Sequence, residues 1–228
     1  MSQLVLDITP EHTPTLSNFV PGRNAELLRV LQDMAAGGES HNVYFWGEAG
    51  SGKTHLLHAV VNALAAVGRT VVYAAGEVPE TPAEVVAIDD VDRLDDAAQI
   101  RLFDLFNRLR EEHGILLVSG NGPLLQLGLR DDLRSRLGWG LIYQLHALND
   151  DEKTATLQAQ ARQRGFTLSE EVVRYLLRHV RRDLPSLVTL LDALDEHSLR
   201  LQRQPSIPML KEILQDHDWS SGSETDPV

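Results

Sequence analysis

A glycine-rich segment near residue 50 restricts the fold of this chain more than any other feature. The segment is Gly47-Glu48-Ala49-Gly50-Ser51-Gly52-Lys53-Thr54. An apolar, strand-like run (43–46) precedes it, and a helix-like run (55–61) follows. The pattern and both neighbours are those of a phosphate-binding loop, G-x-x-x-x-G-K-[S/T]. The sequence therefore predicts a nucleotide-phosphate site between a buried strand and a helix; a glycine-rich turn that binds nothing is the alternative.

Each residue type in this loop has a mechanical reason. Glycines allow backbone conformations in which successive N–H groups point at phosphate oxygens. The first turn of the following helix adds its partial positive charge. Lys53 is expected to reach the β- and γ-phosphates, and Thr54 to bind Mg²⁺ through its hydroxyl.

Composition excludes several classes of protein. The 228 residues contain no cysteine, which excludes disulfides, thiolate metal sites and cysteine nucleophiles. The apolar runs are too short to span a bilayer and the N-terminus does not resemble a secretory signal, so we expect a soluble cytoplasmic protein without a membrane partner. A net charge of −12 argues against a protein whose main task is gripping nucleic acid. The arginine-rich residues 174–182 are either a solvated helix face or a local basic patch.

The first two thirds of the chain alternate between strand-like and helix-like segments. Alternation of this kind predicts an α/β fold with a five-stranded parallel sheet covered by helices on both faces. The expected strands are residues 43–46, 70–75, 85–90, 115–119 and 141–145. A helix over 97–113 is expected to bury one face, made of Ile100, Phe103, Phe106 and Leu109.

The remainder predicts helices alone. Asn149 and the acids after it begin one helix, and further helices begin near residues 167–171, 183 and 206–208. Leucines at helical spacing mark a small core: Leu187, Leu190, Leu191 and Leu194. We expect an extended segment (1–15), an α/β nucleotide-binding domain (16–148), a small all-helical domain (149–216) and a disordered tail (217–228).

Two acidic residues end the third predicted strand. Ligands bind at the carboxyl ends of strands in open α/β sheets. Asp89 is therefore expected to hold Mg²⁺ together with Thr54, directly or through water, and Asp90 to orient an attacking water. The alternative is a polar strand end that faces solvent.

Three further side chains have an open role. Asn121, after the fourth strand, could fix a water beside the γ-phosphate or be a simple turn residue. Arg134 and Arg136, just before the fifth strand, could serve a neighbouring subunit in trans or pack their stems on Trp139. His55 and His58 lie one helical turn apart without an acidic partner nearby in sequence, so we expect helix-surface residues, not metal ligands.

Together these motifs resemble the AAA+ ATPases and, within them, the DnaA family, over about residues 16–216. Asn18-Phe19-Val20-Pro21-Gly22 is similar to the family motif that lies against the adenine, which implies that Val20, Pro21 and the loop-flanking His55 belong to the nucleotide site. The box from Ser135 to Leu141 resembles the family's arginine-finger box, which implies a catalytic Arg136. The resemblance further implies bound ADP or ATP with Mg²⁺ and a helical lid.

Two departures refine the resemblance. We expect no helix-turn-helix domain after the lid, as in the short Hda branch of the family, whose members switch the replication initiator off. Gln3-Leu4-Val5-Leu6-Asp7-Ile8 resembles that branch's clamp-binding peptide, with Gln3, Leu4, Leu6 and Ile8 as contacts, although a short strand is the alternative. Pro185 stands where the family has a lid arginine, and the alternative is that Arg181 or Arg182 substitutes for it.

The function that the resemblance implies is negative regulation of replication initiation. Such a protein docks on the DNA-loaded sliding clamp, the β subunit of DNA polymerase III, and stimulates ATP hydrolysis by the DnaA initiator. It contacts DNA only through the clamp, and a homodimer is left open. A helicase-loader-like or DNA-remodelling ATPase is the first alternative, and a bridge between clamp and initiator without chemistry is the second.

Overall fold

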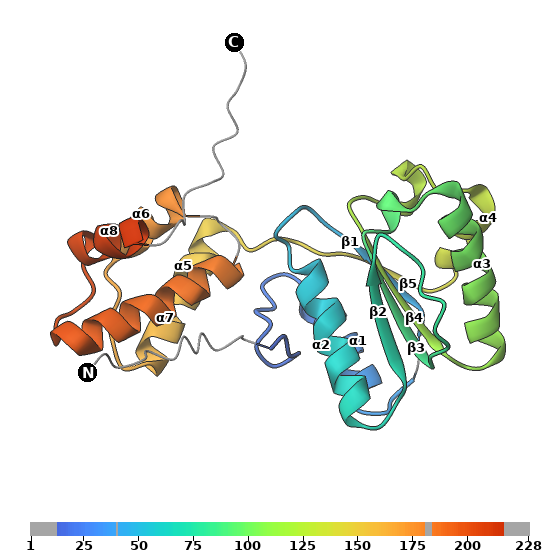
Figure 1. The fold of residues 1–228 in the computed structure, drawn as a ribbon, viewed down its shortest axis with the longest axis horizontal. Coiled ribbons are helices and arrows are strands. Elements are labelled where there is room, and N and C mark those ends of the chain that lie inside the picture. The colour runs from blue at the N-terminus through green and yellow to red at the C-terminus, as the bar shows by residue number, and fades with distance from the viewer. Residues whose placement is uncertain (1–12, 40, 181–183, 217–228) are drawn as a thin grey trace, which may run out of the picture. The chain divides into compact units, whose positions relative to one another are not determined.

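The computed structural model describes residues 13–39, 41–180 and 184–216 (Figure 1). The chain divides into two compact units, an α/β unit that ends at Leu145 and a helical unit that continues from His146. The proposed clamp-contact residues Gln3, Leu4, Leu6 and Ile8, the predicted tail 217–228, and Arg181 and Arg182 lie outside the described residues, as does the side chain of Pro185.

A parallel sheet forms the centre of the α/β unit. Its five strands lie in the order β2-β3-β4-β1-β5, and all four strand pairings are parallel. The prediction of a five-stranded parallel sheet is therefore confirmed. The strands are β1 (Val43–Trp46), β2 (Val71–Ala75), β3 (Val85–Asp89), β4 (Ile115–Gly120) and β5 (Leu141–Gln144).

Helices cover both faces of this sheet (Figure 1). Successive strand residues point to opposite faces: Val43 and Phe45 pack with α1 (Ala25–Ala35) and α2 (Lys53–Ala66), whereas Tyr44 packs with α3 (Asp96–Glu111) and α4 (Asp131–Leu137). Two short 3₁₀ turns, η1 (Val91–Arg93) and η2 (Leu124–Gln126), follow β3 and β4. The three central strands, β3, β4 and β1, are buried over nearly their whole length, which explains why they are apolar runs without polar alternation, whereas the outer strands β2 and β5 are partly exposed.

Two helices differ from expectation. We did not predict α1, although Leu27, Leu28, Leu31 and Met34 repeat at helical spacing and are all buried. In α3 the prediction for Ile100 was wrong, because its side chain is 45% exposed. The buried stripe of α3 is instead Ala98, Leu102, Leu105, Phe106 and Leu109, and Phe103 is partly buried beside it.

The second unit is a helical bundle with its own core, as predicted. Its helices are α5 (Asp150–Gln163), α6 (Glu170–His179), α7 (Leu184–Leu201) and α8 (Ile207–Asp216). Asn149 and Glu152 form a reciprocal capping box at the start of α5, and Ser169 caps α6. The four predicted leucines of α7 are fully buried. Across the described part of the chain, no helix has the length and apolar character needed to cross a membrane.

A glycine fixes the turn from α4 into β5. A Cβ atom built on Gly140 would lie 2.2 Å from the backbone oxygen of Asn42, which is held because the Leu141 N–H donates to that same oxygen. Gly140→Ala is therefore expected to destabilise the α/β unit by about 1–3 kcal/mol, the usual cost of overpacking. Thermal unfolding measures this, with Gly128→Ala as the matched control, since nothing lies within 4 Å of a Cβ there. Equal melting temperatures for both variants would contradict the clash.

Candidate nucleotide-binding site

The phosphate-loop segment leaves β1 and turns directly into α2. Gly50 and Gly52 have φ angles of 77° and 100°, in the left-handed region that favours glycine. A Cβ on Gly52 would lie 2.9 Å from Cε2 of Phe19, so a side chain there would displace the Phe19 ring and would also strain the left-handed backbone. Gly52 caps α2 without a side-chain hydrogen bond, which leaves the N–H groups of the first helical turn open to a ligand.

Lys53 is the buried cation of this loop. The residue is only 7% exposed, and its ammonium donates to the backbone oxygens of Gly47, at 2.7 Å, and Glu48, at 3.2 Å. No carboxylate is paired with it within the described residues. Burying an ammonium without a counter-charge is costly, so a bound anion would relieve a real electrostatic deficit here.

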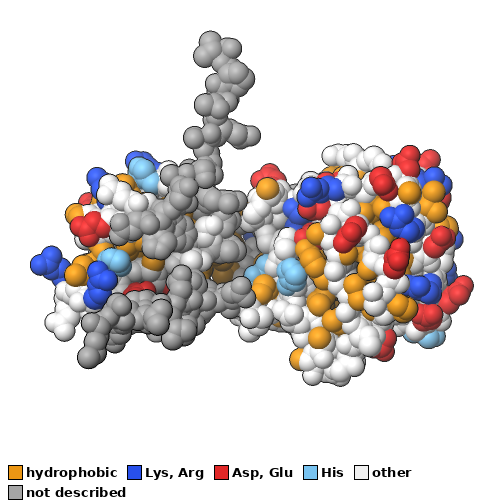
Figure 2. Space-filling model, viewed as in Figure 1, with side chains coloured by type: hydrophobic (Ala, Val, Ile, Leu, Met, Phe, Trp, Pro, Cys, Tyr) orange, Lys and Arg blue, Asp and Glu red, His pale blue; other side chains and the backbone are white. Residues whose placement is uncertain are grey.

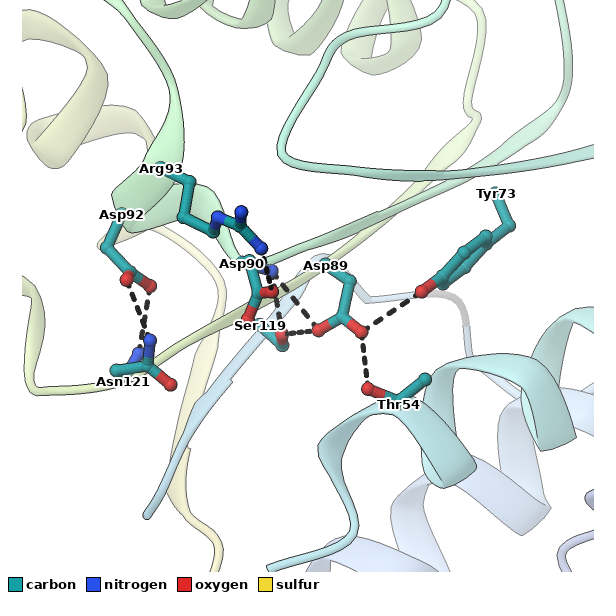
Figure 3. A network of polar contacts seen from close by, with 8 residues as sticks. All are labelled: Thr54, Tyr73, Asp89, Asp90, Asp92, Arg93, Ser119 and Asn121. Atoms are coloured by element: carbon teal, nitrogen blue, oxygen red, sulfur yellow. Dashed lines mark hydrogen bonds and ion pairs between the residues drawn. The ribbon is translucent and has the colours of Figure 1, made fainter. Parts of the chain in front are cut away.

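Asp89 is the centre of a polar network at the ends of three strands and the start of α2 (Figure 3). Its Oδ2 accepts from Thr54 Oγ1 at 2.6 Å and from the Tyr73 hydroxyl at 3.1 Å. Its Oδ1 accepts from the Ser119 hydroxyl and from the Asp90 N–H at 3.1 Å. Thr54 and Asp89 are thus brought together as the sequence predicted, and the carboxylate is held by donors from four elements.

Sequence reasoning missed two members of this network, Tyr73 and Ser119. Burial raises the pKa of Tyr73, and the Asp89 carboxylate raises it further, so the phenol stays protonated and donates. The Tyr73 ring also lies 4.0 Å from the ring of His58, centroid to centroid. The available signal for both was position: each lies at or near the carboxyl end of a strand that neighbours β3 or β1 in the parallel sheet.

Asp90 and Asn121 lie beside this network and have other partners. Asp90 adopts a left-handed φ of 54°, and its carboxylate is 3.5 Å from the guanidinium of Arg93. Asn121 is exposed; its side-chain amide donates to Asp92 Oδ2 at 2.7 Å and its backbone N–H to Oδ1 at 3.0 Å. Figure 3 shows the two pairs on one side of Asp89. The roles expected for Asp90 and Asn121 stay predictions.

The N-terminal motif lies against the phosphate loop. Phe19 packs beside Gly52, and its ring is 5.7 Å from that of His55. His55 Nε2 contacts the backbone oxygen of Thr15 at 3.2 Å, and burial lowers the pKa of His55. Val20 is half-buried and Pro21 exposed, one and two residues beyond Phe19. Neither His55 nor His58 belongs to a cluster of residues suited to hold a metal ion in the part of the chain that the structure describes.

Arg134 and Arg136, two residues apart on α4, have different surroundings. Arg134 forms an ion pair with Asp131. The Arg136 guanidinium instead lies over aromatic rings, 4.1 Å from the ring centre of Trp139 and 5.3 Å from that of Phe103. In the alternative considered from sequence, an arginine packs its stem on Trp139; here the guanidinium itself contacts the ring.

The residues present fit a magnesium nucleotide. The loop offers open N–H groups and an ammonium without a carboxylate partner, and Ser51 Oγ is buried without a hydrogen-bond partner among the described residues. Thr54 Oγ1 and Asp89 are the oxygen ligands that Mg²⁺ prefers, although both Asp89 oxygens already accept hydrogen bonds from the protein. Groups suited to bind the phosphates, at the loop and Lys53, thus lie next to groups suited to bind Mg²⁺, at Thr54 and Asp89.

Fold and site together define a P-loop module of the AAA+ class. Residues 11–78 match the family model of the bacterial DnaA ATPase domain, and residues 150–214 match that of the Hda lid domain. The chain is an AAA+ protein of the DnaA/Hda branch.

Solved structures support the fold. Domain III of the Thermotoga maritima replication initiation protein DnaA has a TM-score of 0.71 at 21% identity, covering 90% of this chain and 97% of that one. AMPPCP-bound DnaA from Aquifex aeolicus gives 0.70 at 21% identity, covering 90% and 69%. The Thermotoga maritima RuvB Holliday junction branch migration motor gives 0.63 at 17% identity, covering 89% and 72%. The AAA+ fold prediction is thereby confirmed.

Proposed function

We propose that this chain is a nucleotide-bound adaptor that stimulates ATP hydrolysis by the DnaA initiator and so inhibits a new round of replication initiation. It binds ADP or ATP with Mg²⁺ in its own phosphate loop and docks on the DNA-loaded sliding clamp through residues 3–8. The hydrolysis that matters takes place in the initiator. The single observation that carries this proposal is the position of Arg136 relative to the chain's own phosphate loop.

Arg136 and the phosphate loop lie at opposite ends of the parallel strands. The loop follows β1 at its carboxyl end, whereas α4 is followed by β5 at its amino end, where Leu141 pairs with Val43 at the start of β1. Because β1 and β5 are parallel, these two ends are separated by the length of β1, about 10 Å for three residue steps. The helices α4 and α2 also pack on opposite faces. This arrangement favours service to another molecule's nucleotide.

The chemistry required of Arg136 is electrostatic. In the initiator's site a water attacks the γ-phosphorus of ATP, and the bond from that phosphorus to the β–γ bridging oxygen breaks, giving ADP and phosphate. Negative charge builds up on the bridging and γ-oxygens, and a guanidinium that donates to them stabilises the transition state. Arg136 supplies this group without taking or giving a proton.

The chain's own nucleotide site has a binding role in this account. Lys53 would contact the phosphates, Thr54 and Asp89 would hold Mg²⁺, and Val20, Pro21 and His55 would border the base. When bound, the magnesium nucleotide supplies the counter-charge for Lys53. The solved DnaA structures bound to AMPPCP support nucleotide binding in this fold.

The initiator is the favoured partner because the chain matches the DnaA ATPase and Hda lid models. AAA+ modules associate with an arginine of one subunit facing the nucleotide of the next, and a DnaA-like module is suited to meet DnaA in this way. The alternative of a helicase-loader-like ATPase requires a DNA surface. On the face of the α/β unit in Figure 2, acidic, basic and apolar side chains are interspersed.

The clamp contact gives a separate prediction. Leu4→Ala combined with Leu6→Ala is expected to weaken clamp binding by about 100-fold or more, since each buried leucine contributes about 1.5–3 kcal/mol. Binding of each variant to surface-immobilised clamp measures the affinity. Val5→Ala is the matched control, because Val5 lies in the same hexapeptide and is not assigned a contact. Clamp binding that survives the double substitution would place the contact elsewhere.

The proposed function is tested with labelled ATP bound beforehand to DnaA and freed of excess nucleotide. DNA-loaded clamp and this chain in its ADP form are added, and conversion of the label to ADP is followed. Conversion that needs all three components is expected. Turnover of added ATP by this chain alone, stimulated by DNA, would favour the remodelling ATPase. A complex of all three components with unchanged ATP would favour a bridge without chemistry.

A further inference from the structure

The guanidinium of Arg136 is held by aromatic rings, whereas that of Arg134, the other arginine of α4, is held by a carboxylate. Trp139 lies beneath it at 4.1 Å, and Phe103 of α3 lies at 5.3 Å. On the Trp139 ring a second cation, Arg110, lies at 4.9 Å, and the edge of Phe106 packs at 6.2 Å between centroids. Trp139 is nevertheless 55% exposed, which is unusual for the largest apolar side chain of a monomeric unit.

Stacking leaves the guanidinium in a particular electrostatic state. Arg136 Nε is buried and has no hydrogen-bond partner among the described residues. A carboxylate partner, such as Asp131 provides for Arg134, would neutralise the charge and occupy the donors. A ring neutralises nothing and occupies no planar donor, since the cation lies over its face. The stacked Arg136 therefore keeps its full charge while its side chain is restricted.

The backbone fixes the ring relative to the sheet. The Trp139 N–H donates to the Arg136 oxygen at 3.1 Å, and the Gly138 N–H donates to the Arg134 oxygen at 3.0 Å. Gly140, the next residue, packs on the backbone of Asn42 at the start of β1. The ring that contacts Arg136 is thus anchored by the end of α4 and by the sheet, and the Phe106 ring of α3 packs against it at a steep angle.

We infer that Trp139 is a positioning residue that holds the Arg136 guanidinium ready for an ATP-bound partner subunit. This inference rests on the proposed function, in which Arg136 acts on the partner's ATP. A free arginine side chain populates many rotamers and loses conformational entropy when it is held against the phosphates. A side chain already restricted before association loses less entropy at that step. The ring thereby contributes to the rate of hydrolysis in the complex more than to the formation of the complex.

The test is single-turnover hydrolysis of DnaA-bound ATP at increasing concentrations of this chain, with DNA-loaded clamp present. Trp139→Ala is expected to lower the maximal rate by about tenfold, within the range of a partly desolvated cation–π contact, and to leave the half-saturating concentration within about twofold, since association is unaffected. Trp139→Phe is expected to restore most of the rate, because a ring remains beneath the guanidinium.

Arg110→Ala is the matched control, because it removes the other cation from the same ring and leaves Arg136 in place. It is expected to keep the wild-type maximal rate. The inference is overturned if Trp139→Phe is as impaired as Trp139→Ala, if the half-saturating concentration rises with an unchanged maximal rate, or if Arg110→Ala loses as much. Absence of stimulation by the wild-type chain would instead overturn the proposed function itself, and the two failures are distinguishable.

Discussion

Arg136→Ala is expected to lower stimulated hydrolysis of initiator-bound ATP by about 10³-fold or more, the effect of removing an arginine finger supplied in trans. The physical reason is that the other arginine of α4, Arg134, is already paired with Asp131 and does not take its place. Nucleotide binding by the chain itself is expected to be unchanged, because Arg136 and the phosphate loop lie at opposite ends of the parallel strands. Single-turnover hydrolysis with preloaded initiator measures the loss.

Arg134→Ala is the matched control for this variant. It removes the same charge from the same helix, but from a guanidinium already held by a carboxylate, so stimulation is expected to fall by less than about tenfold, given the small worth of an exposed ion pair. Thermal unfolding of both variants checks that α4 remains packed. Stimulation that survives Arg136→Ala would remove the arginine from the mechanism.

The second large effect is expected at Lys53. Lys53→Ala is expected to weaken binding of ATP and ADP by about 100-fold or more, since charge-assisted hydrogen bonds contribute about 1.5–3 kcal/mol each. The same change removes a buried ammonium that, among the described residues, donates to the backbone oxygens of Gly47 and Glu48 and to no carboxylate. The nucleotide-free protein is therefore expected to lose less stability than the burial of the side chain would suggest.

Thermal shift in the presence and absence of magnesium nucleotide separates the two effects. Ligand that binds the folded state raises the melting temperature, so the wild-type protein is expected to gain stability with nucleotide and Lys53→Ala to gain little. Lys211→Ala, an exposed lysine of the helical unit, controls for the loss of charge. An equal nucleotide-dependent shift in wild type and Lys53→Ala would show that the loop is not the binding site.

The sequence predicted the sheet and the loop well because their signals are local. The central strands β3, β4 and β1 are covered on both faces and must be apolar over most of their length, and a loop that cradles phosphates needs glycines at left-handed positions such as Gly50 and Gly52. The strand order, with β1 between β4 and β5, depends on long-range pairing that no single segment encodes. Knowledge of the fold family supplies that strand order, which places the phosphate loop and Asp89 together at the carboxyl ends of the strands.

The partners of the polar side chains were harder to predict. From sequence Asn121 was the attractive polar residue after β4, yet the side chain that reaches Asp89 is Ser119. Strand ends are uncertain by a residue or two, and a shift of one residue turns a side chain to the other face. Tyr73 was overlooked because a tyrosine inside an apolar strand is ordinary core, and only the pairing of β2 with β3 brings its hydroxyl to the carboxylate.

The surroundings of Arg136 also needed the three-dimensional structure. Sequence spacing offered two equivalent arginines, Arg134 and Arg136, and one nearby ring, Trp139. Only the packing of α3 beside α4 brings Phe103 to the Arg136 guanidinium and Arg110 to the Trp139 ring, and shows which arginine lies over the rings. An arginine with a carboxylate partner and one with an aromatic partner differ in the charge they can offer to phosphates.

The central claim is that the decisive hydrolysis takes place in the partner's phosphate loop. Labelled ATP preloaded on DnaA, with DNA-loaded clamp, tests it when two variants of this chain, both supplied as the ADP form, are compared for the rate of conversion. Asp89→Asn, which alters the chain's own magnesium network, is expected to retain most of the stimulation, whereas Arg136→Ala is expected to lose it. The reverse pattern, with stimulation lost in Asp89→Asn and retained in Arg136→Ala, would contradict the account.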